Sequence, residues 1–213
     1  MTTAPTPPKT AQEALAQLRE GNQRFVLNVR SVENPLGRSA RQALVAGQRP
    51  FAIILSCSDS RAPSEYIFDQ GLGDLFVIRV AGNVVAPSLV GSVEFAAAKF
   101  GTRLAVVMGH SHCGAVQATL DYVRDGKGAP SDNIRDIVER CREPVATVVS
   151  AAGPKADPEF LMKEAVRANI RNSCDHLRHG SRLLEQLCQN EGMLIVGAEY
   201  SLETGAVDFF DGV

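Results

Sequence analysis

Two short segments contain the residues of this chain whose types and spacing could do chemistry. The first is Cys57-Ser58-Asp59-Ser60-Arg61 and the second is His110-Ser111-His112-Cys113-Gly114. Two thiols and one imidazole form the borderline-soft donor set that zinc prefers. Three strong protein ligands leave one tetrahedral position open, as in catalytic zinc sites. We therefore predict a catalytic zinc site with Cys57, His110 and Cys113 as the ligands of one zinc ion per subunit.

The segments that precede these residues predict where the donors meet. Phe51–Ser56 and Leu104–Gly109 are continuous apolar runs, typical of strands that are covered on both faces. Cys57 and His110 would then follow the carboxyl ends of two strands, which is the edge where doubly wound sheets bind ligands. Cys113 falls at the start of the next predicted helix, whose N-terminus favours the thiolate, the form that binds metal.

Asp59 and Arg61 weigh against two plainer interpretations of the cysteines, as core residues or as part of a closed structural zinc site. If the chain stays extended after Cys57, residues 57, 59 and 61 point the same way. Asp59 would then meet the zinc or its water, and Arg61 would hold Asp59 in a bidentate ion pair. The alternative is a surface ion pair of little energetic value. We predict that Asp59 and Arg61 are catalytic.

Apolar runs that alternate with helical patterns predict an α/β fold with a parallel sheet. Further strands are expected at Leu75–Val80 and Met193–Ala198, and Ala206–Phe210 should return antiparallel to Ala198–Leu202 after a turn at Glu203-Thr204-Gly205. Helices are expected at Thr10–Val29 with a break or kink at Gly21-Asn22, at Ser88–Phe100 with Ser88 as N-cap, and at Ala115–Arg124, Ser131–Val149 and Glu159–Asn190.

Composition narrows the class of protein. A chain of 213 residues, 45% apolar and 22% charged, suits one domain. Within this domain we expect a flexible tail at 1–9, a helical arm at 10–47 and an α/β core at 48–213. A net charge of −2 with scattered basic residues predicts no nucleic-acid or membrane partner. The Thr/Pro-rich start does not resemble a secretory signal, and five cysteines, an odd number, suit reduced thiols. We expect a cytoplasmic protein.

The motifs of this chain resemble those of the β-class carbonic anhydrases. They are Cys57-x-Asp59-x-Arg61, His110-x-x-Cys113-Gly114, Leu18-x-x-Gly21-Asn22-x-Arg24-Phe25, Ile67-Phe68-Asp69-x-Gly71-x-Gly73-Asp74-Leu75-Phe76, Arg79-x-Ala81-Gly82-Asn83 and Gly205-x-Val207. The resemblance covers nearly the whole chain. It implies a parallel sheet ordered 2-1-3-4 with a C-terminal antiparallel fifth strand, flanking helices and an N-terminal helical arm. It also implies a zinc enzyme that interconverts carbon dioxide and bicarbonate, as a homodimer or dimer of dimers whose N-terminal helices wrap the partner.

The resemblance implies a substrate pocket as well. Gln48, nine residues before Cys57, matches a glutamine that reaches the substrate across the dimer interface. Phe76 and Phe95 match the aromatic walls of the carbon dioxide pocket, and Phe95 stands where the family often has tyrosine. The remaining substrate-binding positions implied are Ala81, Asn83 and Gly114. Taken without the family, the two phenylalanines would be interpreted as core residues and Gln48 as part of a solvated loop.

The charge of the donor set predicts how such a site would work. Zinc with two thiolates and a neutral imidazole has a formal charge near zero, so the pKa of its water should exceed the value of roughly 7 found at three-histidine sites. Zinc-bound hydroxide would attack carbon dioxide, and Asp59, which can only accept a hydrogen bond, would orient it.

If Arg61 released Asp59 at low pH, that carboxylate could occupy the open position instead. His112 could be a proton shuttle, an alternative zinc ligand or a bystander.

Two other functions stay open. The same zinc site could hydrolyse carbonyl sulfide or carbon disulfide, because related family members act on these isosteres. A zinc-containing regulatory module without catalysis is also possible, although a site that had lost catalysis would not need the Asp59–Arg61 pair.

Overall fold

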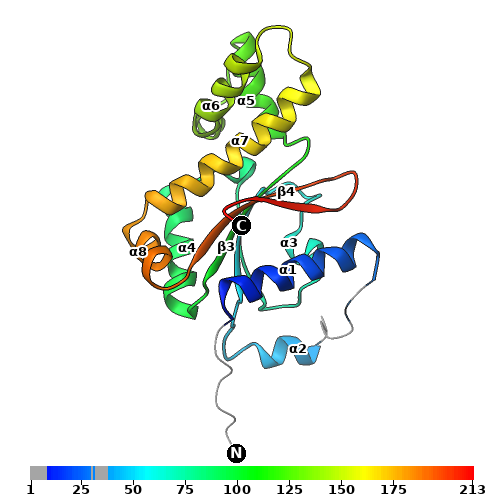
Figure 1. Ribbon diagram of the computed structural model, residues 1–213, viewed down its shortest axis with the longest axis vertical. Helices are drawn as coiled ribbons and strands as arrows, with labels where there is room; N and C mark the ends of the chain where they lie inside the picture. Colours follow the sequence, from blue (N-terminus) through cyan, green and yellow to red (C-terminus); the bar gives the residue numbers. More distant parts are fainter. Residues whose placement is uncertain (1–8, 30, 32–37) are drawn as a thin grey trace, which may run out of the picture.

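A computed structural model describes residues 9–29, 31 and 38–213 and shows a five-stranded sheet between helices (Figure 1). The strands are β1 (Ala52–Ser56), β2 (Leu75–Arg79), β3 (Leu104–His110), β4 (Leu194–Tyr200) and β5 (Val207–Asp211). Their order is β2-β1-β3-β4-β5, with β1 to β4 parallel and β5 antiparallel to β4. The predicted fold is confirmed. Most of the predicted tail and part of the predicted arm lie outside the described residues.

The central strands are apolar throughout because helices cover both faces of the sheet. All five residues of β1 and all seven of β3 are buried. Ile53 and Leu55 belong to the core cluster on one face, whereas Ala52 and Ile54 belong to the cluster on the other. Strands buried on both faces need an apolar residue at every position, which is why their sequences do not alternate.

Two helical layers enclose this sheet. One face carries α1 (Ala11–Val26) and the short α3 (Ser64–Ile67), and the arm continues into α2 (Arg38–Ala43). The other face carries most of the helical mass, namely α4 (Pro87–Phe100), α5 (Gly114–Asp125), α6 (Asp132–Ala152), α7 (Pro158–His179) and α8 (Arg182–Asn190), together with the 3-10 turn η1 (Ala81–Asn83).

Helix α1 runs unbroken through Gly21 and Asn22, so the predicted break at these residues is wrong. A Cβ on Gly21 would lie 1.8 Å from the carbonyl oxygen of Phe68, and only glycine allows the helix to approach so closely. Asn22 Nδ2 donates to the carbonyl oxygen of Gly205 at 2.9 Å, and Asn22 Oδ1 accepts from the Val207 N–H at 2.9 Å. The Gly-Asn pair is therefore a contact between α1 and the rest of the fold rather than a helix end.

Two other helix boundaries differ from the prediction. Helix α4 begins at Pro87 with Ala86 as its N-cap, so Ser88 is not the cap. Proline suits the first helical position because its φ is already helical and its missing N–H would have no partner there. The stretch Glu159–Asn190 forms two helices, because the Ser181 hydroxyl accepts from a backbone N–H and caps a new helix, α8.

The strand order brings the two site segments together. β1 and β3 are neighbours, with Ser56 in register with Met108. The chain leaves β1 through α3 toward β2, whereas β3 leads into α5 and the large helical layer. This is the change of direction at which doubly wound sheets open a ligand-binding crevice, and Cys57 and His110 lie at its mouth.

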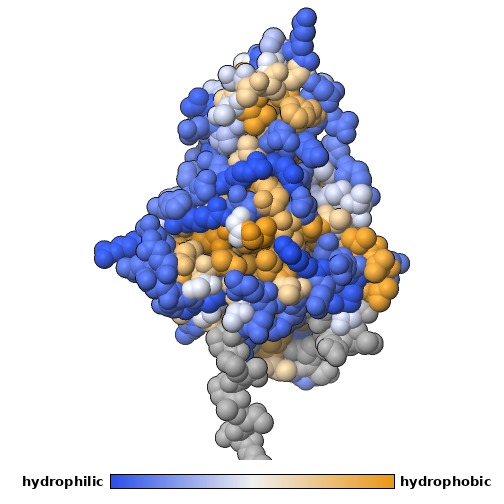
Figure 2. Space-filling model, in the orientation of Figure 1, coloured by the Kyte–Doolittle hydropathy of each residue, from blue (hydrophilic) through white to orange (hydrophobic). Residues whose placement is uncertain are grey.

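Apolar surface gathers in the middle of the face seen in Figure 1 and at its right-hand edge, beside the end of α1 (Figure 2). The exposed apolar residues at this end of α1 are Val26, Leu27 and Val29. Among the described residues, no helix is both long and apolar enough to cross a bilayer.

Candidate metal centre

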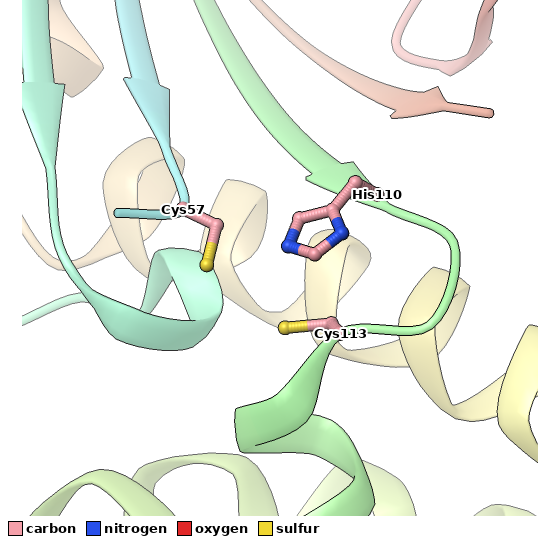
Figure 3. Close-up of side chains that lie close together, drawn as sticks. All are labelled: Cys57, His110 and Cys113. Carbon is pink, nitrogen blue, oxygen red and sulfur yellow. The ribbon is translucent and has the colours of Figure 1, made fainter. Parts of the chain in front are cut away.

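The three predicted ligands converge on one buried point (Figure 3). Cys57 follows the last residue of β1, His110 ends β3 and Cys113 is the N-cap of α5. Their ligand atoms, two sulfurs and one ring nitrogen, all lie within 4.8 Å of one another. Donors at this spacing need to move by about 1 Å or less to share one zinc ion at bond lengths of about 2.0–2.3 Å.

The imidazole of His110 is held in the tautomer that a metal requires. Its Nδ1 lies 2.8 Å from the carbonyl oxygen of Ser111, and a carbonyl can only accept, so Nδ1 carries the hydrogen. Nε2 therefore presents a lone pair. This Nε2 is buried and has no hydrogen-bond partner among the described residues. A buried nitrogen without a partner is costly, and a metal ion between the sulfurs would satisfy it.

The two thiols lie close enough to shift each other's pKa in opposite directions. The Cys113 thiol donates to Cys57, and this bond, together with the nearby His110 ring and the Gly82 N–H, lowers the pKa of Cys57 to about 4. The pKa of Cys113 is raised, first because it donates that bond and then because it is buried. Burial lowers the pKa of His110, but the adjacent Cys57 sulfur and the hydrogen bond to the Ser111 carbonyl outweigh burial, so the net pKa is raised. Surroundings that favour a proton on this ring also favour a divalent cation beside it.

A turn at η1 supports the first sulfur. The Gly82 N–H lies 3.4 Å from Cys57 Sγ, and Gly82 has a φ of +68°. A Cβ at this position would lie 2.9 Å from that of Ala115. Two polar residues of α7 fix the turn, because Asn169 donates to the Gly82 carbonyl at 2.8 Å and Ser173 donates to the next carbonyl at 3.0 Å. Asn169 and Ser173 were not predicted from the sequence, although two polar residues about one helical turn apart on an otherwise apolar helix face are a usable signal.

Asp59 and Arg61 form the predicted ion pair, but the backbone conformation that brings them together differs from the predicted one. The Ser58 N–H still bonds to the Val80 carbonyl, but the chain turns at 59–62, where the Ala62 N–H bonds to the Asp59 carbonyl, so the condition that the chain stays extended as far as Arg61 is not met. Arg61 reaches the Asp59 carboxylate through its backbone N–H at 2.9 Å, its Nε at 2.9 Å and its Nη2 at 2.7 Å. These bonds hold the pKa of Asp59 well below its usual range. Asp59 Oδ2 lies 3.8 Å from Nε2 of His110, beside the predicted metal position.

Arg79, at the end of β2, braces this turn. Its Nε donates to the Cys57 carbonyl at 3.1 Å and its Nη2 to the Asp59 carbonyl at 2.6 Å. One guanidinium thus fixes the backbone on both sides of Ser58. The first ligand and the carboxylate are therefore positioned as a unit.

The predicted substrate-binding residues fall into two groups. Ala81, Asn83 and Gly114 lie near the ligands, in η1 and at the start of α5. Asn83 is buried with a φ of +45°, and its Nδ2 has no partner among the described residues. Phe76 and Phe95 lie elsewhere, in a cluster with Phe100 whose ring centroids are 5.9–6.2 Å apart.

Phe76, Phe95 and Gln48 lie away from the three predicted ligands of their own chain. Phe76 is in register with Ile53, four residues before Cys57, which is about 13 Å along a strand. Phe95 is 53% exposed. Gln48 is exposed in the loop before β1, at the opposite end of that strand from Cys57.

A pocket of about 800 Å³ lies beside the ligand loop rather than over the ligands. Ser111 and His112 line it, together with residues of α7 and of the β4–β5 hairpin. None of the three ligands does. His112 is exposed, and its Nε2 lies 2.7 Å from Oε1 of Glu203.

Comparison with known proteins agrees with this geometry. A family model described as "Carbonic anhydrase" matches residues 52–207. The solved structure of "the beta-carbonic anhydrase CcaA" superposes with a TM-score of 0.71 at 27% identity, covering 93% of this chain and 95% of that one. The chain belongs to the β-carbonic anhydrase family. The resemblance noted from the sequence motifs is thereby confirmed.

Curated carbonic anhydrases match this chain over most of their length. "Carbonic anhydrase 2" of Mycobacterium tuberculosis is 38% identical over 188 residues, which is 88% of this chain and 87% of the relative. "Carbonic anhydrase" of Mycolicibacterium smegmatis is 38% identical over 191 residues, covering 90% and 89%. A β-carbonic anhydrase of Sordaria macrospora, described as tetrameric, has a TM-score of 0.72 at 20% identity over 80% of this chain and 85% of its own, and shows the shared fold.

Proposed function

We propose that this β-carbonic anhydrase catalyses the reversible hydration of carbon dioxide to bicarbonate and a proton, with one zinc ion per subunit. The observation that carries the proposal is the arrangement of the ligand group, in which the lone pair of His110 Nε2 lies buried and unpartnered beside two sulfurs. A carboxylate held in a fixed position lies 3.8 Å from that nitrogen. A structural zinc site would have no use for this carboxylate.

Zinc held by Cys57, His110 and Cys113 would lower the pKa of a bound water far below that of free water and so supply hydroxide. The chain's own residues would direct it. Asp59 stays a carboxylate because Arg61 depresses its pKa, and a carboxylate can only accept a hydrogen bond. It would therefore fix the hydroxyl hydrogen and leave an oxygen lone pair aimed at the substrate carbon. Arg61 acts as a positioning residue, since it touches Asp59 rather than the reacting atoms.

We also propose that the substrate pocket is completed by a second copy of the chain. Gln48, Phe76 and Phe95 lie away from the ligands of their own subunit, which fits contributions to a partner's site. Val26, Leu27 and Val29, exposed at the end of α1, supply apolar surface that a partner would cover. The tetrameric relative is consistent with a homodimer or a dimer of dimers.

We propose a cytoplasmic location. All five cysteines are free, including Cys57 and Cys113, whose sulfurs lie within 4.8 Å of each other. Ligand thiols of this kind are best preserved in a reducing compartment.

The test is stopped-flow carbon dioxide hydration by the zinc-loaded protein and two variants. Asp59→Asn should lower kcat by about 10²-fold, the usual cost of losing one preorganised hydrogen-bonding group. Asp136→Asn is the matched control, because Asp136 also accepts two bonds from an arginine, Arg140, but on an exposed face of α6. It should leave turnover unchanged.

The same assay with carbonyl sulfide separates the alternatives. Turnover of carbonyl sulfide with little hydration of carbon dioxide would make the protein a hydrolase that uses this site. A protein that binds zinc stoichiometrically but turns over neither substrate would be a regulatory module. Either result would overturn the proposal.

A further inference from the structure

Ser111 lies in the sequence between the predicted ligand His110 and His112. Its backbone N–H, its hydroxyl and its carbonyl all make hydrogen bonds. Its N–H donates to the Tyr200 carbonyl at 3.0 Å, which extends the β3–β4 pairing past His110. Its Oγ accepts from the Leu202 N–H at 3.0 Å and donates to Glu203 Oε2 at 3.0 Å. Its carbonyl accepts from His110 Nδ1 at 2.8 Å. The N–H and hydroxyl of Ser111 thus bond to the end of β4 and the turn after it, and its carbonyl bonds to the predicted ligand His110.

This arrangement sets the direction of the His110 lone pair. The hydrogen on Nδ1 points at the Ser111 carbonyl, so the position of that carbonyl determines where Nε2 aims. Three hydrogen bonds of Ser111 fix that carbonyl, one to Tyr200 at the end of β4 and two to Leu202 and Glu203 in the turn that follows. A hydrogen-bond partner behind a ligating histidine fixes both its tautomer and its orientation.

Glu203 ties the next residue into the same unit. Its Oε2 accepts from the hydroxyls of Ser111 and Ser201, and its Oε1 lies 2.7 Å from Nε2 of His112. His112 has a φ of +53°, in the left-handed region that L-residues rarely adopt. Such backbone persists only where the surroundings enforce it. This unusual residue makes the chain reverse so that Cys113 returns to the ligand group.

We propose that Ser111 is a positioning residue of the metal centre, which locks the His110 ring for metal binding through its bonds to the β4–β5 turn, with Glu203 as its anchor. The proposal rests on the proposed function in so far as zinc must bind at the ligand group. It assigns the turn at 201–205, which contributes no ligand, a role in holding the metal.

Zinc transfer to a chromogenic chelator from the loaded protein tests this role. Ser111→Ala removes both side-chain bonds and should speed transfer by about 10- to 100-fold, the usual effect of losing an outer partner of a ligand. Glu203→Ala should have a smaller effect, because the Ser111 hydroxyl still accepts from Leu202. Ser111→Thr keeps the hydroxyl and should restore the wild-type rate. In the cobalt-substituted protein, the visible absorption bands should change in Ser111→Ala and remain unchanged in Ser111→Thr.

Thr204→Ala is the matched control within the turn. It removes the hydroxyl that accepts the Ala206 N–H but touches neither Ser111 nor Glu203. It should leave both zinc transfer and the cobalt spectrum unchanged. If it speeds transfer as much as Ser111→Ala does, the effect comes from general loosening of the hairpin and the role of Ser111 is wrong.

The failures of the two proposals are distinguishable. A wild-type protein that binds no zinc contradicts the proposed function itself. A wild-type protein that holds zinc, combined with a Ser111→Ala variant that releases it no faster and has the same cobalt spectrum, contradicts only the positioning role.

Discussion

The ligand edge of the sheet and the aromatic surface over β2 differ in how complete they are within one chain. At the ligand edge, His110 is 1% exposed and is oriented by the neighbouring Ser111. At the aromatic surface, Phe95 is 53% exposed although it packs against two other rings. One chain thus suffices to build the donor set, whereas on our proposal the walls that enclose the substrate need a second chain. Metal binding and substrate enclosure should therefore be separable by mutation.

The largest effect should follow from removing a ligand. Cys113→Ser should abolish stoichiometric zinc binding and lower turnover by more than about 100-fold, the upper range for losing outer partners of a metal ligand. The oligomeric state should not change. Metal analysis, stopped-flow assays and sedimentation velocity measure the three properties. Cys188→Ser is the control, since Cys188 is half-buried in α8 and lies outside the ligand group.

A charge on the aromatic surface should change the oligomeric state and turnover but not zinc binding. Phe95→Glu should dissociate the oligomer and lower turnover while leaving zinc content at one ion per chain, because a carboxylate cannot be buried there without a partner. Phe160→Glu is the matched control, as Phe160 is also 53% exposed but lies in the first turn of α7. An intact, fully active Phe95→Glu oligomer would show that this surface is not the interface.

The pH dependence sharpens the comparison, because it depends on the ligand edge alone. Two thiolates leave little net positive charge on the zinc, so kcat/KM should rise with pH and reach half its maximum above the value of roughly 7 found at three-histidine sites. Asp59 should not contribute to this rise, since Arg61 keeps its pKa far below the range. A rate that stays constant from about pH 6.5 to 9 would contradict the prediction.

The smallest effect concerns stability at the turn that anchors Ser111. Hydrogen bonds from its own N–H and from the hydroxyls of Ser201 and Ser111 lower the pKa of Glu203 from 4.5 to about 2. The unfolded chain therefore takes up this proton first as the pH falls. The stabilising contribution of Glu203 is complete above pH 4.5 and is lost between pH 4.5 and 2.

Urea unfolding of wild type and Glu203→Gln measures this contribution. Glu203 is 54% exposed, so the difference in free energy of unfolding at pH 7 should be below about 1 kcal/mol. It should vanish near pH 2. A difference that grows on acidification would contradict the assigned sign.

The fold and the grouping of Cys57, His110 and Cys113 were predictable because each depends on a local pattern. Continuous apolar runs identify strands that are buried on both faces, and Cys57 and His110 directly follow two of them. The wrong predictions concerned residues whose role depends on contacts between distant segments of the chain. Gly21 and Asn22 have the composition of a helix end, yet the approach of Phe68 and the Val207 N–H explain them.

The supporting residues around the ligands were less accessible to sequence reasoning. Asn169 and Ser173 lie 56 and 60 residues after Cys113, and only the packing of α7 on η1 brings them to the site. The turn after Cys57 depends on Arg79, which arrives from the neighbouring strand. Gln48, Phe76 and Phe95 could be named from the family, but a single chain does not bring them to its own ligands.

The hydrogen bonds of Asn22 bear on how the protein is synthesised. Its partners Gly205 and Val207 are 183 and 185 residues further along the chain. The first helix therefore cannot complete its docking until almost the entire polypeptide has left the ribosome, and its apolar face needs protection until then. Nascent chains stalled before residue 200 should consequently be stronger clients of chaperones than the finished protein.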